Sequence, residues 1–144
     1  MQPQDPVHAE PAATLRQLIM GFRATQLVHV AAKLGLADLL RAGPQPPHRL
    51  AQAVRAEPQA LQRLLRALAS LGLFAETADG AFALTPMAQL LQTGVTGSLR
   101  SLAVLYGEEW LWQAYGRMLY SQERPAGIRA HSRPAVLRLS TRPP

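Results

Sequence analysis

The chain has 144 residues, 48% of them hydrophobic, which suffices for one domain with a buried core. The net charge is +6, but residues 122–144 hold five arginines against one glutamate, so residues 1–121 carry only +2, from 10 basic and 8 acidic side chains. A nearly neutral body argues against nucleic-acid binding, and zero cysteines exclude disulfides and thiolate metal sites.

The N-terminal residues show no targeting signal. Residues 1–11 lack the basic stretch followed by an apolar stretch that a secretory signal needs, and no apolar run reaches the ~20 residues that span a bilayer. We therefore predict a cytoplasmic protein with no membrane contact, and we assign residues 1–14 to a flexible N-terminus. The four histidines are scattered rather than set at ligand spacing, so we predict no metal site. They are His8, His29, His48 and His131.

Residues 15–40 form the first predicted helical region, with a break at Gly35 and a short helix at 37–40. Its first helix is apolar around much of its circumference, which is more than a single core covers. We therefore predict that it packs against a second chain. The candidate dimer interface consists of Leu18, Ile19, Phe22, Leu27 and Val30.

Two amphipathic helices follow. The first is short, at about 47–55. The second begins at Pro58, which suits a first helical position, and ends before Gly72, which suits the position past a helix end. One apolar stripe runs along this second helix. It comprises Leu61, Leu64, Leu65, Leu68 and Leu71.

After Gly72 the apolar period changes to two, and Asp79-Gly80 predicts a tight hairpin turn. Thr85-Pro86 then reads as an N-cap with proline at the first position of a short helix through Leu91. Helix, turn, helix and hairpin in this order predict a winged-helix arrangement. The predicted fold class is mainly α, with a small two-stranded β-wing and extra flanking helices.

Residues 98–120 are predicted helical and contain five of the eight aromatic residues, including both tryptophans. Aromatic clusters of this kind form cores, interfaces or pockets for flat ligands. Two readings stay open: an ordinary core, which is the commoner use of aromatics at helical spacing, and a substrate pocket. The candidate substrate-pocket wall is Tyr106, Trp110, Trp112 and Met118.

Five segments together resemble the N-terminal dimerisation domain of bacterial S-adenosylmethionine-dependent small-molecule O-methyltransferases. They are LRQLIMGF (15–22), AAKLGLADLL (31–40), LQRLLRALASLGL (61–73), FALTP (82–86) and EEW (108–110). The resemblance covers residues 15–120. It implies a homodimer that exchanges its first helices and helps to wall a substrate pocket, in an enzyme that transfers a methyl group from S-adenosylmethionine to a hydroxyl of a small molecule.

In that family the cofactor and the catalytic base belong to a C-terminal domain. No glycine-rich G-x-G-x-x-G loop follows a strand here, so we expect no catalytic and no cofactor-binding residue in this chain and no activity of the chain alone. Residues 121–144 have no apolar period and are rich in Arg, Pro and Ser, which favours disorder. One choice of synonymous codons for 122–140, read one base later, encodes a continuation similar to that of the family. We interpret this tail as an out-of-frame extension that truncates the enzyme before its catalytic domain.

Two alternatives remain. A DNA-binding winged-helix regulator would place Gln59, Gln62, Arg63 and Arg66 in the major groove. The nearly neutral body and a wing turn at 78–81 without a basic residue argue against it. In the second alternative the chain is a regulatory partner that forms a heterodimer with an intact methyltransferase subunit.

Overall fold

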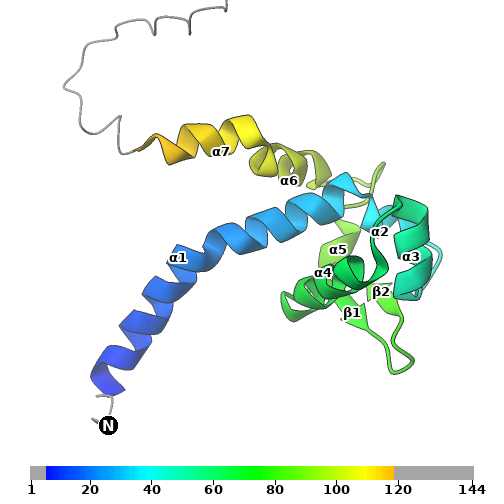
Figure 1. The fold of residues 1–144 in the computed structure, drawn as a ribbon, viewed down its shortest axis with the longest axis horizontal. Helices are drawn as coiled ribbons and strands as arrows, with labels where there is room; N and C mark the ends of the chain where they lie inside the picture. The colour runs from blue at the N-terminus through cyan, green and yellow to red at the C-terminus, as the bar shows by residue number, and fades with distance from the viewer. Residues whose placement is uncertain (1–5, 119–144) are drawn as a thin grey trace, which may run out of the picture.

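The structure is a computed structural model that describes residues 6–118, with side chains from Glu10 onward. In this range the chain forms seven helices and one antiparallel hairpin (Figure 1). They are α1 (Pro6–Lys33), α2 (Leu36–Leu39), α3 (Pro47–Val54), α4 (Pro58–Ser70), β1 (Phe74–Glu76), β2 (Phe82–Leu84), α5 (Pro86–Gln89), α6 (Arg100–Gly107) and α7 (Glu109–Gly116). The mainly helical class with a two-stranded wing is confirmed. The predicted tail at 121–144 lies outside the described residues.

Helix α1 extends well beyond the rest of the fold. Its C-terminal end lies against the body, and its N-terminal half projects away from it (Figure 1). The helix begins at Pro6, ahead of Leu15, so the flexible N-terminus predicted for residues 1–14 is helical from Pro6 onward. Proline suits this position because the first helical N–H groups have no partner within the helix. The sequence carries no apolar pattern that marks the start of this helix, because the side chains from Glu10 through Arg23 are exposed and none of them faces a core.

The core lies under α2, α3, α4 and the wing. Seven large side chains are almost fully buried there, and the stripe of α4 supplies two of them. The seven are Leu36, Leu40, Leu50, Leu65, Leu68, Phe74 and Phe82. Leu71 differs from the prediction, because α4 ends at Ser70 and Leu71 is 42% exposed as the residue that follows.

Local signals set the ends of α4 and the wing. The Glu57 carboxylate accepts hydrogen bonds from the backbone N–H groups of Gln59 and Ala60 and so caps the helix at Pro58. Gly72 adopts a left-handed φ of 75°, which lets the chain reverse into β1. The hairpin then pairs Ala75 with Ala83 across the predicted turn. The winged-helix elements therefore form where the sequence pattern placed them.

The predicted region 98–120 is two helices rather than one. The chain turns at Glu108, which has extended backbone angles (φ −65°, ψ 139°). Helix α6 lies along the C-terminal half of α1, and α7 continues beyond it (Figure 1). The break therefore produces a corner between α6 and α7 that lies against α1.

Three α1 side chains on one helix face hold this corner. The His29 ring nitrogen Nδ1 lies 2.9 Å from the Val104 carbonyl oxygen, and Gln26 Nε2 lies 3.5 Å from the Gly107 carbonyl oxygen. Lys33 Nζ forms an ion pair with Glu108 at 2.7 Å, and this hydrogen bond lowers the pKa of the Glu108 carboxyl from its ordinary value. These residues are three and four positions apart, so a single stripe of α1 makes all three contacts.

Candidate dimer interface and ligand grooves

The N-terminal half of α1 carries an apolar ridge, which consists of Leu15, Leu18, Ile19 and Phe22. Leu18 is 74% exposed and Ile19 is 63% exposed, while Leu15 and Phe22 are about half exposed. Contiguous apolar surface of this kind on a soluble protein marks an interaction site. Three of the five predicted interface residues lie in this ridge, and Leu15, which the sequence reading left out, shares their helix face.

The two remaining predicted interface residues lie nearer the body. Leu27 is partly buried and packs against the core of its own chain. Val30 is also partly buried and lines a shallow hollow with Phe22 and Leu27. The apolar character of α1 therefore has two origins. Its C-terminal half belongs to the domain core, and its N-terminal half forms the exposed ridge.

An aromatic groove lies where α1 faces the corner of α6 and α7. It has a volume of about 360 Å³ and is lined by Phe22, Thr25, Tyr106, Trp112 and Tyr115. Phe22 meets Trp112 edge to face, with ring centroids 6.2 Å apart and an interplanar angle of 74°. The Trp112 indole Nε1 donates a hydrogen bond to the Tyr106 carbonyl oxygen at 2.7 Å. That bond orients the indole while its ring remains available to a ligand.

The structure brings together two of the four predicted pocket residues, Tyr106 and Trp112. Trp110 is 60% exposed and lies almost opposite Trp112 on α7, because two helical positions differ by about 200°. Met118 is 58% exposed and follows the end of α7. The sequence reading missed Phe22, Thr25 and Tyr115 as groove residues. Only the position of Tyr115 three residues after Trp112 offered a signal.

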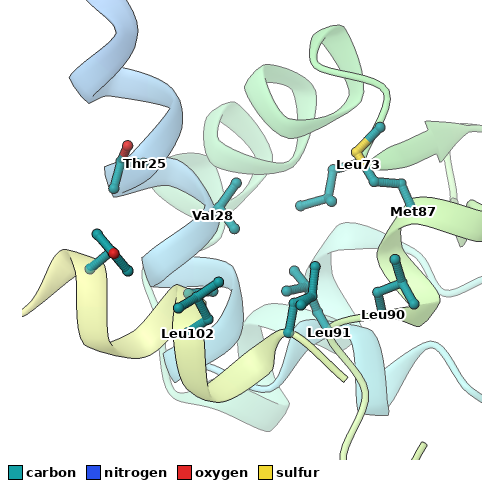
Figure 2. A pocket seen from close by; sticks show the side chains of 10 residues that line it. Thr25, Val28, Leu73, Met87, Leu90, Leu91 and Leu102 are labelled. Carbon is teal, nitrogen blue, oxygen red and sulfur yellow. The ribbon is translucent and has the colours of Figure 1, made fainter. Parts of the chain in front are cut away.

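A second, aliphatic groove lies on the other side of Thr25 and Tyr106, which line both hollows. Its volume is about 340 Å³, and side chains from α1, the start of the wing, α5 and α6 form its wall (Figure 2). They include Val28, Leu73, Met87, Leu90, Leu91 and Leu102. Leu102 is 50% exposed and Met87 is 54% exposed. The groove is thus an open apolar surface rather than a sealed cavity.

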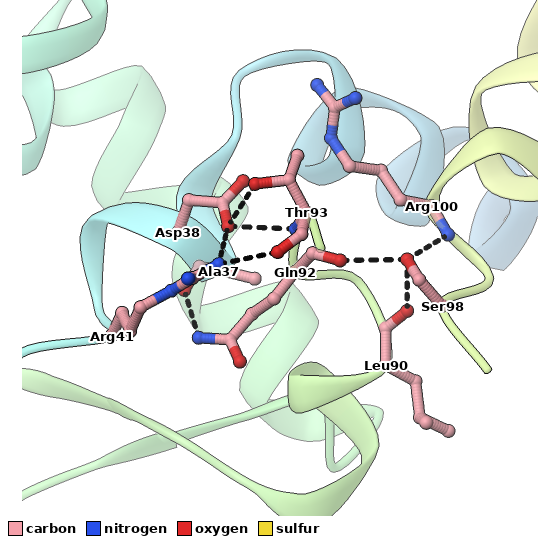
Figure 3. Close-up of polar contacts among 8 residues, drawn as sticks. All are labelled: Ala37, Asp38, Arg41, Leu90, Gln92, Thr93, Ser98 and Arg100. Atoms are coloured by element: carbon pink, nitrogen blue, oxygen red, sulfur yellow. Dashed lines mark hydrogen bonds and ion pairs between the residues drawn. The ribbon is translucent and has the colours of Figure 1, made fainter. Parts of the chain in front are cut away.

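A polar cluster fixes the loop after α5, which follows the lining residues Leu90 and Leu91. Asp38 Oδ1 accepts hydrogen bonds from the Thr93 N–H at 2.9 Å, from the Thr93 hydroxyl at 3.1 Å and from Arg41 Nη2 at 2.7 Å (Figure 3). The buried Gln92 donates to the Ala37 carbonyl oxygen at 3.2 Å, and the Ser98 hydroxyl donates to the Gln92 carbonyl oxygen at 2.8 Å. These bonds tie the loop after α5 to α2.

The cluster makes the stability of the fold depend on pH. Burial raises the pKa of Asp38, but the hydrogen bonds from Thr93 and Arg41 outweigh it, so the pKa lies below its ordinary value. A depressed pKa stabilises the fold above the unfolded value of about 4, and the contribution is lost as pH falls through the folded pKa. We expect Asp38→Asn to destabilise the protein by about 1 kcal/mol at pH 7. The difference should shrink as pH falls through the folded pKa and vanish below it, in thermal unfolding followed across pH.

A matched control for this experiment is Glu10→Gln, which removes the same charge from an exposed position of α1. We expect its unfolding curve to follow that of the unsubstituted chain from acid to neutral pH. A constant loss of stability in Asp38→Asn at every pH would mean that packing, and not the carboxylate charge, accounts for the effect.

A family model described as the O-methyltransferase dimerisation domain matches residues 16–94, which is more than half of the chain. The chain belongs to this family. The match includes the ridge except Leu15, the winged-helix core and much of the aliphatic groove, and it ends before α6 and α7.

Individual relatives agree with the family match. Phenazine O-methyltransferase PhzM of Lysobacter antibioticus is 42% identical over 110 residues, which are 76% of this chain and 32% of that protein. The crystal structure of LaPhzM superposes with a TM-score of 0.74 at 41% identity, covering 78% of this chain and 33% of that one. CalO1, a methyltransferase in calicheamicin biosynthesis solved in its SAH-bound form, gives a TM-score of 0.70 at 31% identity, covering 86% and 37%.

This dimerisation domain therefore spans about a third of the length of the methyltransferases that it matches. Its described residues do not fit a binding site for S-adenosylmethionine. The sheet is a two-stranded antiparallel hairpin, so residues 6–118 contain no parallel strand that leads through a glycine-rich loop into a helix. Within the same range no cluster of three or more His, Asp or Glu could hold a metal ion, and no helix is long and apolar enough to cross a membrane.

The alternative of a DNA-binding regulator receives no support. Arg66, which would have to reach DNA, instead pairs with Glu76 of the wing at 3.2 Å. Relatives matched over most of this dimerisation domain, PhzM and CalO1, are methyltransferases.

Proposed function

We propose that this chain forms a homodimer through the α1 ridge. The observation that carries the proposal is the exposure of Leu18 and Ile19 on a domain whose family is defined by dimerisation. Association through the ridge removes its apolar surface from water, and this removal is the main driving force of most protein association. Residues 10–19 are exposed and project away from the body (Figure 1), so the core of their own chain does not account for their apolar face.

We also propose that the aromatic groove is one wall of a substrate pocket in a small-molecule methyltransferase. The groove offers the faces and edges of Trp112, Tyr106 and Phe22, which suit a planar aromatic ligand. The phenazine in the name of the PhzM relative is such a ligand. The reaction of the whole enzyme would be methyl transfer to a hydroxyl of that ligand. The SAH-bound form of CalO1 supports S-adenosylmethionine as the donor, held by residues other than those described here.

The homodimer is tested by the molar mass of the full chain in solution. Sedimentation equilibrium should give twice the 15.7 kDa of one chain, with dissociation on dilution. A mass of one chain at every concentration up to the solubility limit would refute the proposed pairing.

The aromatic wall is tested by tryptophan fluorescence with phenazine as the probe. We expect phenazine to quench the unsubstituted chain in a saturable way, and Trp112→Phe to remove most of that quenching. Trp110→Phe is the matched control, because Trp110 is exposed on the opposite face of α7 and its loss should leave the saturable quenching in place. Equal quenching in both variants would indicate collisional contact with exposed rings rather than a groove site.

A further inference from the structure

The end of α6 borders the aromatic groove and has carbonyl oxygens that need partners from outside the helix. The last carbonyl groups of an α-helix lack donors, because no further turn follows them. At the end of α6 the backbone N–H of Glu108 bonds to the Leu105 oxygen at 3.2 Å. Three neighbouring carbonyl oxygens instead accept hydrogen bonds from side chains. The pairs are His29 with Val104, Trp112 with Tyr106, and Gln26 with Gly107.

Two of these three donors come from α1. Gln26 and His29 lie three residues apart and therefore on one side of that helix. A carbonyl oxygen only accepts hydrogen bonds, so the Nδ1 atom of His29 carries the proton that it shares with Val104. The imidazole also fills the space beside Gly107, where a Cβ would overlap it. The last turn of α6 is thus held against α1 by a close packing contact as well as by hydrogen bonds.

The third donor connects this turn to the groove. Trp112 Nε1 bonds to the Tyr106 carbonyl oxygen, and in the chain that carbonyl lies between the two that α1 holds. The other support of the indole is the ring of Phe22, which meets it edge to face and also belongs to α1. The acceptor that orients the indole and the ring that packs against it are therefore both fixed relative to one helix.

The stability of the helix end does not by itself require donors from α1. Water satisfies the last carbonyl groups of many helices, particularly near the surface. Donors on a second helix add something that water does not supply, which is a fixed position of the turn. A binding site needs such support, because its side chains must be held close to the geometry in which they contact the ligand.

We propose that Gln26 and His29 are positioning residues for the aromatic groove, and that they orient Trp112 for a planar ligand by holding the last turn of α6. Neither residue lines the groove, so neither contacts the ligand itself. The inference rests on the proposed substrate wall for its ligand. It goes beyond that proposal by assigning the residues that set the geometry of the wall.

The first test reads the orientation of the indole without a ligand. Trp110→Phe in the full chain leaves Trp112 as the single tryptophan, so the tryptophan band of the near-ultraviolet circular dichroism reports on it alone. We expect His29→Ala to remove most of this band while the far-ultraviolet spectrum keeps the helical signal. His29→Asn should retain the band, because the amide nitrogen of asparagine is as many bonds from the backbone as Nδ1 and also donates. Equal bands in the two variants would overturn the inference.

Two further variants serve as controls for this test. Asp38→Asn lowers stability through the polar cluster, away from the aromatic groove, and should keep the band. Arg23→Ala changes an exposed residue three positions before Gln26 on the same helix and should also keep it. If His29→Ala does not fold, Gln26→Met decides, because it removes the other α1 donor and retains the side-chain length. An unchanged band in Gln26→Met would then contradict the proposed positioning.

The second test measures the affinity for phenazine by the saturable quenching of Trp112. We expect His29→Ala to raise the dissociation constant by about tenfold, because the ligand must then order the indole as it binds. Asp38→Asn should leave the constant within about threefold. An unchanged constant in His29→Ala would overturn the inference. Absence of phenazine binding by the unsubstituted chain would instead refute the substrate wall, and the circular dichroism of the ligand-free protein would still decide whether Gln26 and His29 position the indole.

Discussion

Replacement of Leu18 by aspartate is expected to convert the dimer into a folded monomer. Leu18 is 74% exposed in the single protomer, so the change removes no packing from the core of its own chain. In the dimer the same position would bury a carboxylate without a partner, which costs several kcal/mol. Each 1.4 kcal/mol is a factor of ten, so we expect the dissociation constant to rise by about 100-fold or more.

The measurement is sedimentation velocity over a dilution series, with circular dichroism to show that the helical content is kept. Gln17→Asp is the matched control, because it adds the same charge one residue away and off the ridge. It should leave the dimer intact. A dimer that persists in Leu18→Asp would exclude the ridge as the interface. Phe22 is a less informative position, because it also contacts Trp112 of its own chain.

The variants Leu18→Asp and Gln17→Asp should also differ in how their melting temperature depends on protein concentration. When only the folded chain dimerises, the melting temperature rises with protein concentration. We expect this dependence for the unsubstituted chain and for Gln17→Asp, and its loss in Leu18→Asp.

The second large effect concerns Gly107, at the corner between α6 and α7. A Cβ placed on Gly107 would overlap the imidazole ring of His29, and backbone and ring are both held at this point. Gly107→Ala should therefore force α6 away from α1 and break the contact between His29 and the Val104 carbonyl oxygen. Overpacking of this kind typically costs 1–3 kcal/mol, so we expect a loss of about 3 kcal/mol in urea unfolding.

Gly116→Ala is the control for this substitution. Gly116 ends α7, and a Cβ there meets no atom within 4 Å. Alanine is the better helix former, so the variant should be unchanged or slightly more stable, by less than about 1 kcal/mol. If Gly107→Ala and Gly116→Ala have the same stability, the close approach of His29 to the corner is not a feature of the protein in solution.

The sequence by itself determined the elements whose causes are local. Pro58 and Gly72 bound α4 because a first helical position tolerates a missing N–H and a reversal after a helix needs a left-handed residue. The hairpin formed around Asp79-Gly80 for the same kind of reason, and Thr85 caps α5 as predicted. The family was also recognisable from the resemblance carried by five sequence segments in their order along the chain, as the match to residues 16–94 confirms.

Only the tertiary structure decided which side chains meet. Asp38 and Thr93 are far apart in the chain, and no local preference relates them, yet they bind each other in the polar cluster. Trp110 and Trp112 are equivalent as residues, and the position of α1 alone determines that Trp112 borders the aromatic groove. Leu18 and Leu27 likewise belong to one apolar helical pattern in the sequence, but the body of the domain covers only Leu27. Caps and turns depend on a few neighbouring residues, whereas a groove depends on where separate helices pack.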